Sequence, residues 1–309
     1  MKAIVLSLTV VFSLIGSMRS MGQEISLKSE FFGNSGYYYL PPGEKPSERI
    51  GDAKGSAAVV QASFSMPLSV RAEEGRRPTI WGIGIGGSYT SLNNQNFTDY
   101  MVSEIMDLQA GVFHMRPISD KWSLRASLGV GIFSPTADLS KVRLRNVLGS
   151  AGLVFICHIR PNLSVGGGLA LNSSLGYPMV FPAVYLNWDL NGKFDISAEL
   201  IDGLDIAGSY EFNDWFKLAY ALEMNGQVAM VKKDGKNMIF SHQYIVTGFR
   251  PEIKLRKSGV SVIAMAGLNL YRPASFSERT LKGIFAGDND YYFSVSPYVS
   301  VGVKYNFGK

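Results

Sequence analysis

Residues 292–307 of the chain read YFSVSPYVSVGVKYNF. Apolar side chains occupy almost all the odd positions, and small or polar ones occupy most of the even positions. This period of two predicts a β-strand with one apolar face. Strands of soluble domains have about 5–6 residues, whereas a tilted membrane-spanning strand needs about 9–11 residues in hydrocarbon and aromatic residues at its ends. Phe293, Tyr305 and Phe307 fit that requirement. The stretch therefore predicts the closing strand of a transmembrane β-barrel, with an edge strand of a soluble β-domain as the alternative.

The N-terminal residues have the pattern of a secretory signal. Lys2 gives a positive start, residues 4–15 are apolar, and a small-x-small cleavage site ends at Gly22. We expect a signal peptide over residues 1–22 and a single barrel domain over residues 23–309. No later apolar run is long enough for a helical membrane span, so the alternating pattern places the exported chain in the bacterial outer membrane.

The composition is typical of a folded chain with few charges. Its 309 residues include 33 Gly, 18 Phe and 15 Tyr, only 18% are charged, and the mean hydropathy is +0.08. The formal charge of +5 falls to +3 without Lys2 and Arg19, which is too weak to indicate a nucleic-acid partner. The single cysteine, Cys157, excludes an intramolecular disulfide.

Alternating segments along the chain predict an all-β, antiparallel up-and-down barrel of about 14 strands. Short and long connections alternate, and the expected long ones include residues 41–55, 225–237 and 272–290. The weakest strand assignments are the first, at residues 24–32, and the pair that flanks residues 201–203. Without one such pair the barrel would have 12 strands, which is the alternative count.

Charged residues within the predicted strands fall on the face opposite the apolar one. An Arg or Lys on the lipid face at mid-depth costs about 2–4 kcal/mol, so these charges are expected inside the barrel, and the interior is expected to be polar. Glu252 has this parity as well. The candidate lumen-lining residues are Asp107, Arg125, Asp195, Glu199, Asp205, Glu211, Lys217, Glu223, Arg250, Lys254 and Lys304.

Four prolines, Pro178, Pro182, Pro251 and Pro297, fall within predicted strands. Proline has no N–H to donate to a ladder, and a closed barrel has no free edge. We therefore expect these positions at rims or bulges.

Other apparent motifs have simple structural explanations. Gly82, Gly84 and Gly86 imitate a phosphate-binding loop, but they alternate with apolar residues along a strand and no helix pattern follows. Ser241 and His242 could form a hydrolase pair near the predicted extracellular end, although no third member can be identified. No zinc or calcium pattern is present. The sequence thus predicts no catalytic residues, no cofactor and no metal.

Several stretches together resemble a known group of proteins. They are the signal followed by Gln23, residues 50–68 running into residues 81–92, residues 177–188 and the ending at residues 299–307. In these features the chain is similar to the uncharacterised outer-membrane β-barrel proteins of Bacteroidota, and the group it most resembles is domain-of-unknown-function family 6268. The resemblance implies the fold and the location and implies no activity.

Barrels of this kind usually end on an aromatic residue that the outer-membrane assembly machinery recognises. Here Phe307 is followed by Gly308 and Lys309, which departs from that pattern. The candidate assembly signal is Val299, Val301, Val303, Tyr305 and Phe307.

Three functions are compatible with these observations. A small pore or transporter-like channel follows most directly from a polar, charged lumen. A closed structural or ligand-binding barrel is the first alternative, and an outer-membrane hydrolase is the second. The expected partners are outer-membrane lipid, the assembly machinery and a small polar solute.

Overall fold

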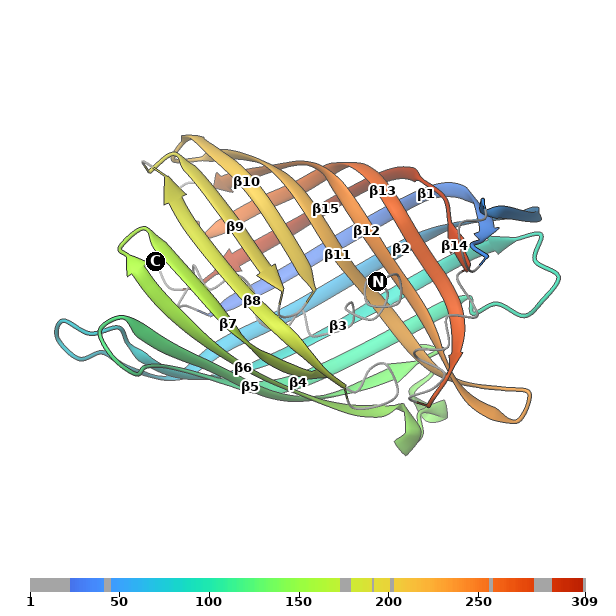
Figure 1. Cartoon of the computed structure of the whole chain (residues 1–309), viewed down its shortest axis with the longest axis horizontal. Helices are drawn as coiled ribbons and strands as arrows, with labels where there is room; N and C mark the ends of the chain where they lie inside the picture. Colours follow the sequence, from blue (N-terminus) through green and yellow to red (C-terminus); the bar gives the residue numbers. More distant parts are fainter. Residues whose placement is uncertain are drawn as a thin grey trace.

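The computed structural model describes residues 23–41, 46–172, 179–190, 192–200, 203–255, 258–280 and 291–307. They form a closed antiparallel barrel of 14 strands (Figure 1), in which β14 and β15 are two pieces of the last strand. Two short 3₁₀ helices, η1 (Leu139–Lys141) and η2 (Leu144–Asn146), lie between β5 and β6. The strands are β1 (Glu24–Tyr39), β2 (Glu48–Arg71), β3 (Thr79–Gln95), β4 (Glu104–Pro117), β5 (Trp122–Ser134), β6 (Val147–Arg160), β7 (Leu163–Asn172), β8 (Met179–Leu190), β9 (Phe194–Leu200), β10 (Leu204–Asn213), β11 (Phe216–Lys233), β12 (Lys236–Leu255), β13 (Val260–Glu278), β14 (Tyr291–Phe293) and β15 (Ser296–Asn306).

The last strand closes the barrel by pairing with both β1 and β13, as the alternation of its side chains predicts. Val299 and Val301 are more than half exposed, whereas Tyr298 and Ser300 between them are buried inside. The predicted fold and strand number are confirmed. The predicted signal peptide lies outside the described residues, and in the described part of the chain no helix has the length and apolar character needed to cross a bilayer.

Most short turns lie at one end of the barrel, on the left in Figure 1, which we call the short-turn end. Residues 118–121, 161–162 and 214–215 connect consecutive strands there. The predicted alternation of short and long connections fails at the opposite end between β11 and β12. Residues 225–237 were expected to form a long connection, but the two strands continue to a tight turn at Asp234 and Gly235. Both residues have positive φ angles, +50° and +78°, as a two-residue hairpin turn requires.

The far half of β11 keeps its pairing with β12 up to Lys233 but has no pairing with β10. Strand β10 pairs with β11 only as far as Met224, and the remaining residues of β11 approach β4 and β5 across the interior. The Asn146 side chain donates to the carbonyls of Phe133 and Met230, at 3.0 and 3.2 Å. Val228 and Met230 pack with Phe133 in a buried cluster. Opposite walls of the barrel therefore touch at this level.

A coordinated irregularity runs across β13, the last strand and β1, and we call it the bulge line. In each strand, the residues that face inward change between odd and even numbers along the strand. The change falls between Asn269 and Arg272 in β13, between Phe293 and Ser296 in the last strand, and between Phe32 and Ser35 in β1. The three strands keep a constant register with one another through it, whereas the pairing with β12 on one side and β2 on the other shifts by one residue. A one-residue shift turns every later side chain to the other face.

The bulge line overturns two predictions. Phe293 was expected on the outer face, but it is completely buried inside the barrel. Arg272 was expected in the loop over residues 272–290, but it belongs to β13 and pairs with Phe293 on β14. The strands also approach closely here, since a Cβ at Gly33 of β1 would lie 2.9 Å from Pro297 Cδ.

The interior has two parts. Ion pairs fill the half toward the short-turn end, and a group of buried rings lies beyond them; we call this group, Phe32, Phe240, Tyr244, Phe293 and Tyr298, the aromatic layer. Ring centroids within it lie 4.7 Å apart for Phe32 and Tyr244, and 5.1 Å apart for Phe32 and Tyr298. A uniformly polar interior, as expected from strand parity, is therefore wrong for this second part.

Pro182, Pro251 and Pro297 each lie where the ladder on one side of the strand is interrupted, and each keeps a paired residue on the other side. Pro182 is in the part of β8 that extends beyond its pairing with β9. The β12–β13 ladder has no paired residues at Pro251, and Pro297 follows the break between β14 and β15. Pro178 lies outside the described residues.

Candidate functional site

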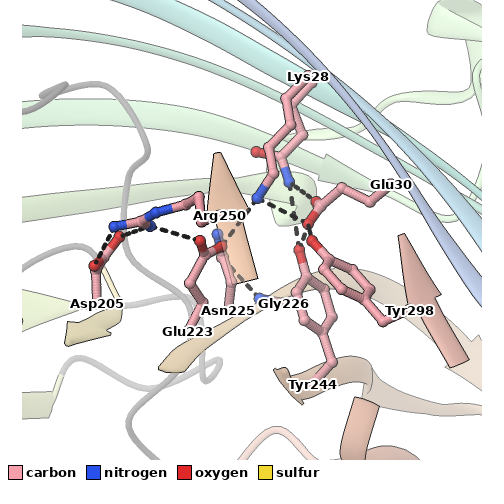
Figure 2. Close-up of polar contacts among 10 residues, drawn as sticks. Lys28, Glu30, Asp205, Glu223, Asn225, Gly226, Tyr244, Arg250 and Tyr298 are labelled. Carbon is pink, nitrogen blue, oxygen red and sulfur yellow. Dashed lines mark hydrogen bonds and ion pairs between the residues drawn. The ribbon is translucent and has the colours of Figure 1, made fainter. Parts of the chain in front are cut away.

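The buried carboxylate of Glu30 is the centre of a polar cluster inside the barrel (Figure 2). Its side chain is fully buried and makes four contacts. It accepts hydrogen bonds from the Tyr244 hydroxyl at 2.8 Å, the Tyr298 hydroxyl at 2.5 Å and the Gln61 amide at 2.5 Å, and Lys28 Nζ lies 3.0 Å away. The rim of the aromatic layer thus consists of hydroxyls that satisfy a buried charge.

Lys28 continues the cluster across the barrel. Its Nζ also lies 3.0 Å from Glu223 Oε2, and Glu223 Oε1 lies 2.7 Å from Arg250 Nη1. The Arg250 guanidinium holds Asp205 with two bonds, of 2.7 and 3.2 Å. We call the five charged residues Lys28, Glu30, Asp205, Glu223 and Arg250 the charge network (Figure 2).

The charge network spans strands that are far apart in the wall. Strand β1 carries Lys28 and β11 carries Glu223, and β12, β13 and β15 lie between them, so the two side chains can meet only across the interior. The network contains three carboxylates and two cations. Removing one partner of a buried pair costs about 3–5 kcal/mol, because the other charge is then left unsatisfied. The network therefore ties opposite parts of the wall together.

Strand alternation explains how the sequence builds this arrangement. Lys28 and Glu30 are two residues apart on β1, so they share its inner face. Asp205 and Glu223 are direct partners in the β10–β11 ladder. Arg250 on β12 reaches both carboxylates.

The other candidate lumen-lining residues, except Asp107, also form ion pairs, mostly between strands that are not neighbours. The Arg125–Glu199 pair joins β5 to β9 across the barrel, and the other pairs bridge one intervening strand or link neighbours. These pairs are Arg125–Glu199 at 2.9 Å, Lys217–Asp195 at 2.6 Å, Lys254–Glu211 at 3.2 Å and Lys304–Glu24 at 2.8 Å.

Asp107 is separate from these pairs. It is 3% exposed and accepts hydrogen bonds from the backbone of Val228 and the side chain of Ser88. It therefore belongs to the contact between β4 and the far half of β11.

Both β1 members of the charge network are absent from the predicted lumen-lining residues. Lys28 and Glu30 were not among the candidates, because the first strand was the weakest assignment. The signal was present in the alternation of Leu27 and Phe31, which are at least half exposed, with the two charged residues. Tyr244 and Tyr298 could not be recognised, since their role depends on where Glu30 lies.

Ser241 and His242 do not form a hydrolase pair. As consecutive residues of β12 they project to opposite faces of the strand. His242 is buried beside Gln227, with 3.2 Å between His242 Nδ1 and Gln227 Oε1. Among the described residues, no three His, Cys, Asp or Glu side chains gather in a way that could hold a metal ion.

The residues of the candidate assembly signal lie on the outer face of β15 or just beyond it. Val299, Val301, Val303 and Phe307 are 45–53% exposed. The rings of Tyr305 and Phe307 are in contact, with centroids 4.4 Å apart, and the Phe307 N–H donates to the Gln23 carbonyl at 2.8 Å. Their recognition by assembly machinery stays a prediction.

The chain belongs to the DUF6268 family, a domain of unknown function, whose model matches residues 18–306. No curated protein matches the chain.

Among solved structures, the similar ones include outer-membrane channels and transporters. The COG4313 outer membrane channel from Pseudomonas putida F1 is 10% identical, with a TM-score of 0.45, and the match covers 95% of this chain and 100% of that one. The deltaS2 mutant of the monoaromatic hydrocarbon channel TodX, a protein of Pseudomonas putida, is 11% identical with a TM-score of 0.46 and coverage of 93% and 90%. The Ralstonia pickettii toluene transporter TbuX is 9% identical with a TM-score of 0.40 and the same coverage.

Proposed function

We propose that the protein is an outer-membrane barrel that admits a small solute through its interior, and that the charge network is the barrier on that route. The outer face supports the location, because apolar side chains such as Leu128 and Phe249, 63% and 59% exposed, would otherwise face water.

Tryptophan positions support the same location. The four tryptophans of the chain, Trp81, Trp122, Trp188 and Trp215, are 38–50% exposed and lie within a few residues of the turns at the short-turn end. Tryptophan is enriched where a membrane meets water. We infer that this end of the barrel lies at the periplasmic interface.

The observation that carries the proposal is the Lys28–Glu223 ion pair across the barrel. Side chains alone make this connection, so rotamer changes can break it without unfolding a strand. The network also has solvent-accessible members: the side chains of Asp205 and Lys28 are 45% and 32% exposed. Water inside the barrel can thus stabilise these charges when the pair separates.

Conductance in planar lipid bilayers tests the proposal. Lys28→Ser with Glu30→Ser removes one cation and one anion and shortens both side chains, so we expect a larger conductance than that of the wild type. The control is Lys236→Ser with Glu278→Ser, which removes an exposed ion pair of 2.5 Å outside the network and should leave the conductance unchanged. Equal conductance in all three proteins would contradict the proposed barrier.

A closed ligand-binding barrel is the second candidate. The contact of β11 with β4 and β5 and the aromatic layer favour it, because both fill the interior beyond the charge network. It predicts no conductance in the wild type or in either double variant.

A further inference from the structure

Arg272 is a buried cation that has no anionic partner among the described residues. Its side chain is completely buried, and Nη2 donates to the Gly55 carbonyl at 2.7 Å. Within the described residues, Nε and Nη1 have no hydrogen-bond partner and no carboxylate forms an ion pair with the guanidinium. The inner cations of the ion pairs described above differ in this respect, since each lies within 3.2 Å of a carboxylate oxygen.

A second unsatisfied group lies beside the same ring. His242 is completely buried, and in the described part of the chain its Nε2 has no partner. The Phe32 centroid lies 5.9 Å from Arg272 Cζ and 6.0 Å from the centre of the His242 ring. Ser35, which pairs with Gly55 in the β1–β2 ladder, also has a buried hydroxyl without a partner among these residues.

Leaving such groups unsatisfied is costly. An unpaired buried donor or acceptor costs about 1–3 kcal/mol, and more when it is charged. The cation–π contact of Arg272 with Phe293, 3.9 Å from Cζ to the ring centroid, offsets part of this cost but leaves the two N–H groups unsatisfied. A ligand that brings acceptor oxygens would remove the penalty.

The surroundings define the chemistry of that ligand. A carboxylate matches the planar fork of a guanidinium with two parallel hydrogen bonds. The rest of the ligand would meet rings of the aromatic layer, which favour an apolar body. In its Nε2–H tautomer, a neutral His242 ring can donate a further bond from Nε2, with Nδ1 facing the Gln227 amide.

We propose that Arg272, together with His242, binds the carboxylate of a small apolar acid inside the barrel. This proposal adds the chemical class of the solute to the proposed function. It rests on that function in one respect, which is that the solute must reach the interior. Binding to the purified protein is measured without a membrane, so the binding result and the conductance result can fail separately.

Calorimetric titration in a non-ionic detergent compares 4-phenylbutyrate with 4-phenylbutanol, which has the same apolar body without the carboxylate. We expect the wild type to bind the acid at least tenfold more tightly than the alcohol. Arg272→Met should abolish this preference, and because it removes an unpaired charge, the folded barrel should resist heat in SDS at least as well as the wild type.

Arg125→Met is the matched control, because it removes a buried guanidinium that already has a carboxylate partner, Glu199 at 2.9 Å, and lies outside the charge network. It should lower the resistance to heat and keep the preference for the acid in the folded fraction. Equal binding of acid and alcohol by the wild type would overturn the proposal, whether or not the variants fold. Sulfate that competes as strongly as the acid would also overturn it, since the site would then bind inorganic anions.

Discussion

Replacing Glu223 by Gln measures how much the charge network stabilises the barrel. The Glu223 side chain is 13% exposed and lies between Lys28 Nζ, at 3.0 Å, and Arg250 Nη1, at 2.7 Å. Glu223→Gln keeps the shape but weakens two hydrogen bonds that involve charged groups, each worth about 1.5–3 kcal/mol. Lys28 keeps Glu30 and Arg250 keeps Asp205, so the loss should be less than the full sum. We expect the free energy of unfolding to fall by about 3 kcal/mol.

Urea unfolding of the protein in lipid vesicles provides the measurement. Glu252→Gln on β12 is the control, because Glu252 is partly buried and forms no ion pair with the described residues. Its effect should be about 0.5 kcal/mol or less. Combining Glu223→Gln with Lys28→Met should give a coupling energy of about 1–2 kcal/mol. Strictly additive effects, or equal effects of the two Gln variants, would refute the network as a stabilising unit.

Three further predictions concern the membrane, assembly and the remaining ion pairs. The unboiled protein should resist SDS and migrate faster than the boiled protein in a gel; equal mobility together with solubility without detergent would exclude a membrane barrel. Phe307→Ala should lower the amount in the outer membrane, as measured by fractionation, whereas deleting Gly308 and Lys309 should have little effect; the reverse pattern would mean that the closing strand is misassigned. Glu199→Gln with Asp195→Asn should lower the temperature at which SDS resistance is lost, because ion-pair partners are removed from two inner cations. If that variant conducts ions, its cation selectivity should fall, and unchanged selectivity would show that these carboxylates do not line the passage.

Local alternation was sufficient to predict the strands and most of the inner charges. A side chain in a strand faces in or out according to its parity, so Arg125, Asp195 and Glu223 could be placed without any knowledge of their partners. Their pairing could not be predicted in the same way. The contact between Lys28 and Glu223 depends on how the closed barrel brings β1 opposite β11, and this is a property of the whole wall.

Parity also fails wherever the wall is irregular. Phe293 was misplaced because the last strand changes parity at the bulge line, which its own sequence does not show. Arg272 was misplaced because the strand was predicted to end before it, whereas β13 continues to Glu278. The connection between β11 and β12 was wrongly predicted to be a long loop, because residues 225–237 are mostly polar. In the structure, Gln227 is buried and the Asp234-Gly235 turn joins two long strands.

The clustering of tryptophan at the short-turn end determines what intrinsic fluorescence can report. Because all four indoles lie near one rim, the emission of the protein follows the environment of that rim alone. Quenching by lipids brominated at different depths should therefore locate this rim relative to the bilayer. A solute bound at Arg272, in the part of the interior beyond the charge network, should leave the emission nearly unchanged. Tryptophan fluorescence should thus report the insertion of this barrel into a membrane and not the binding of a ligand.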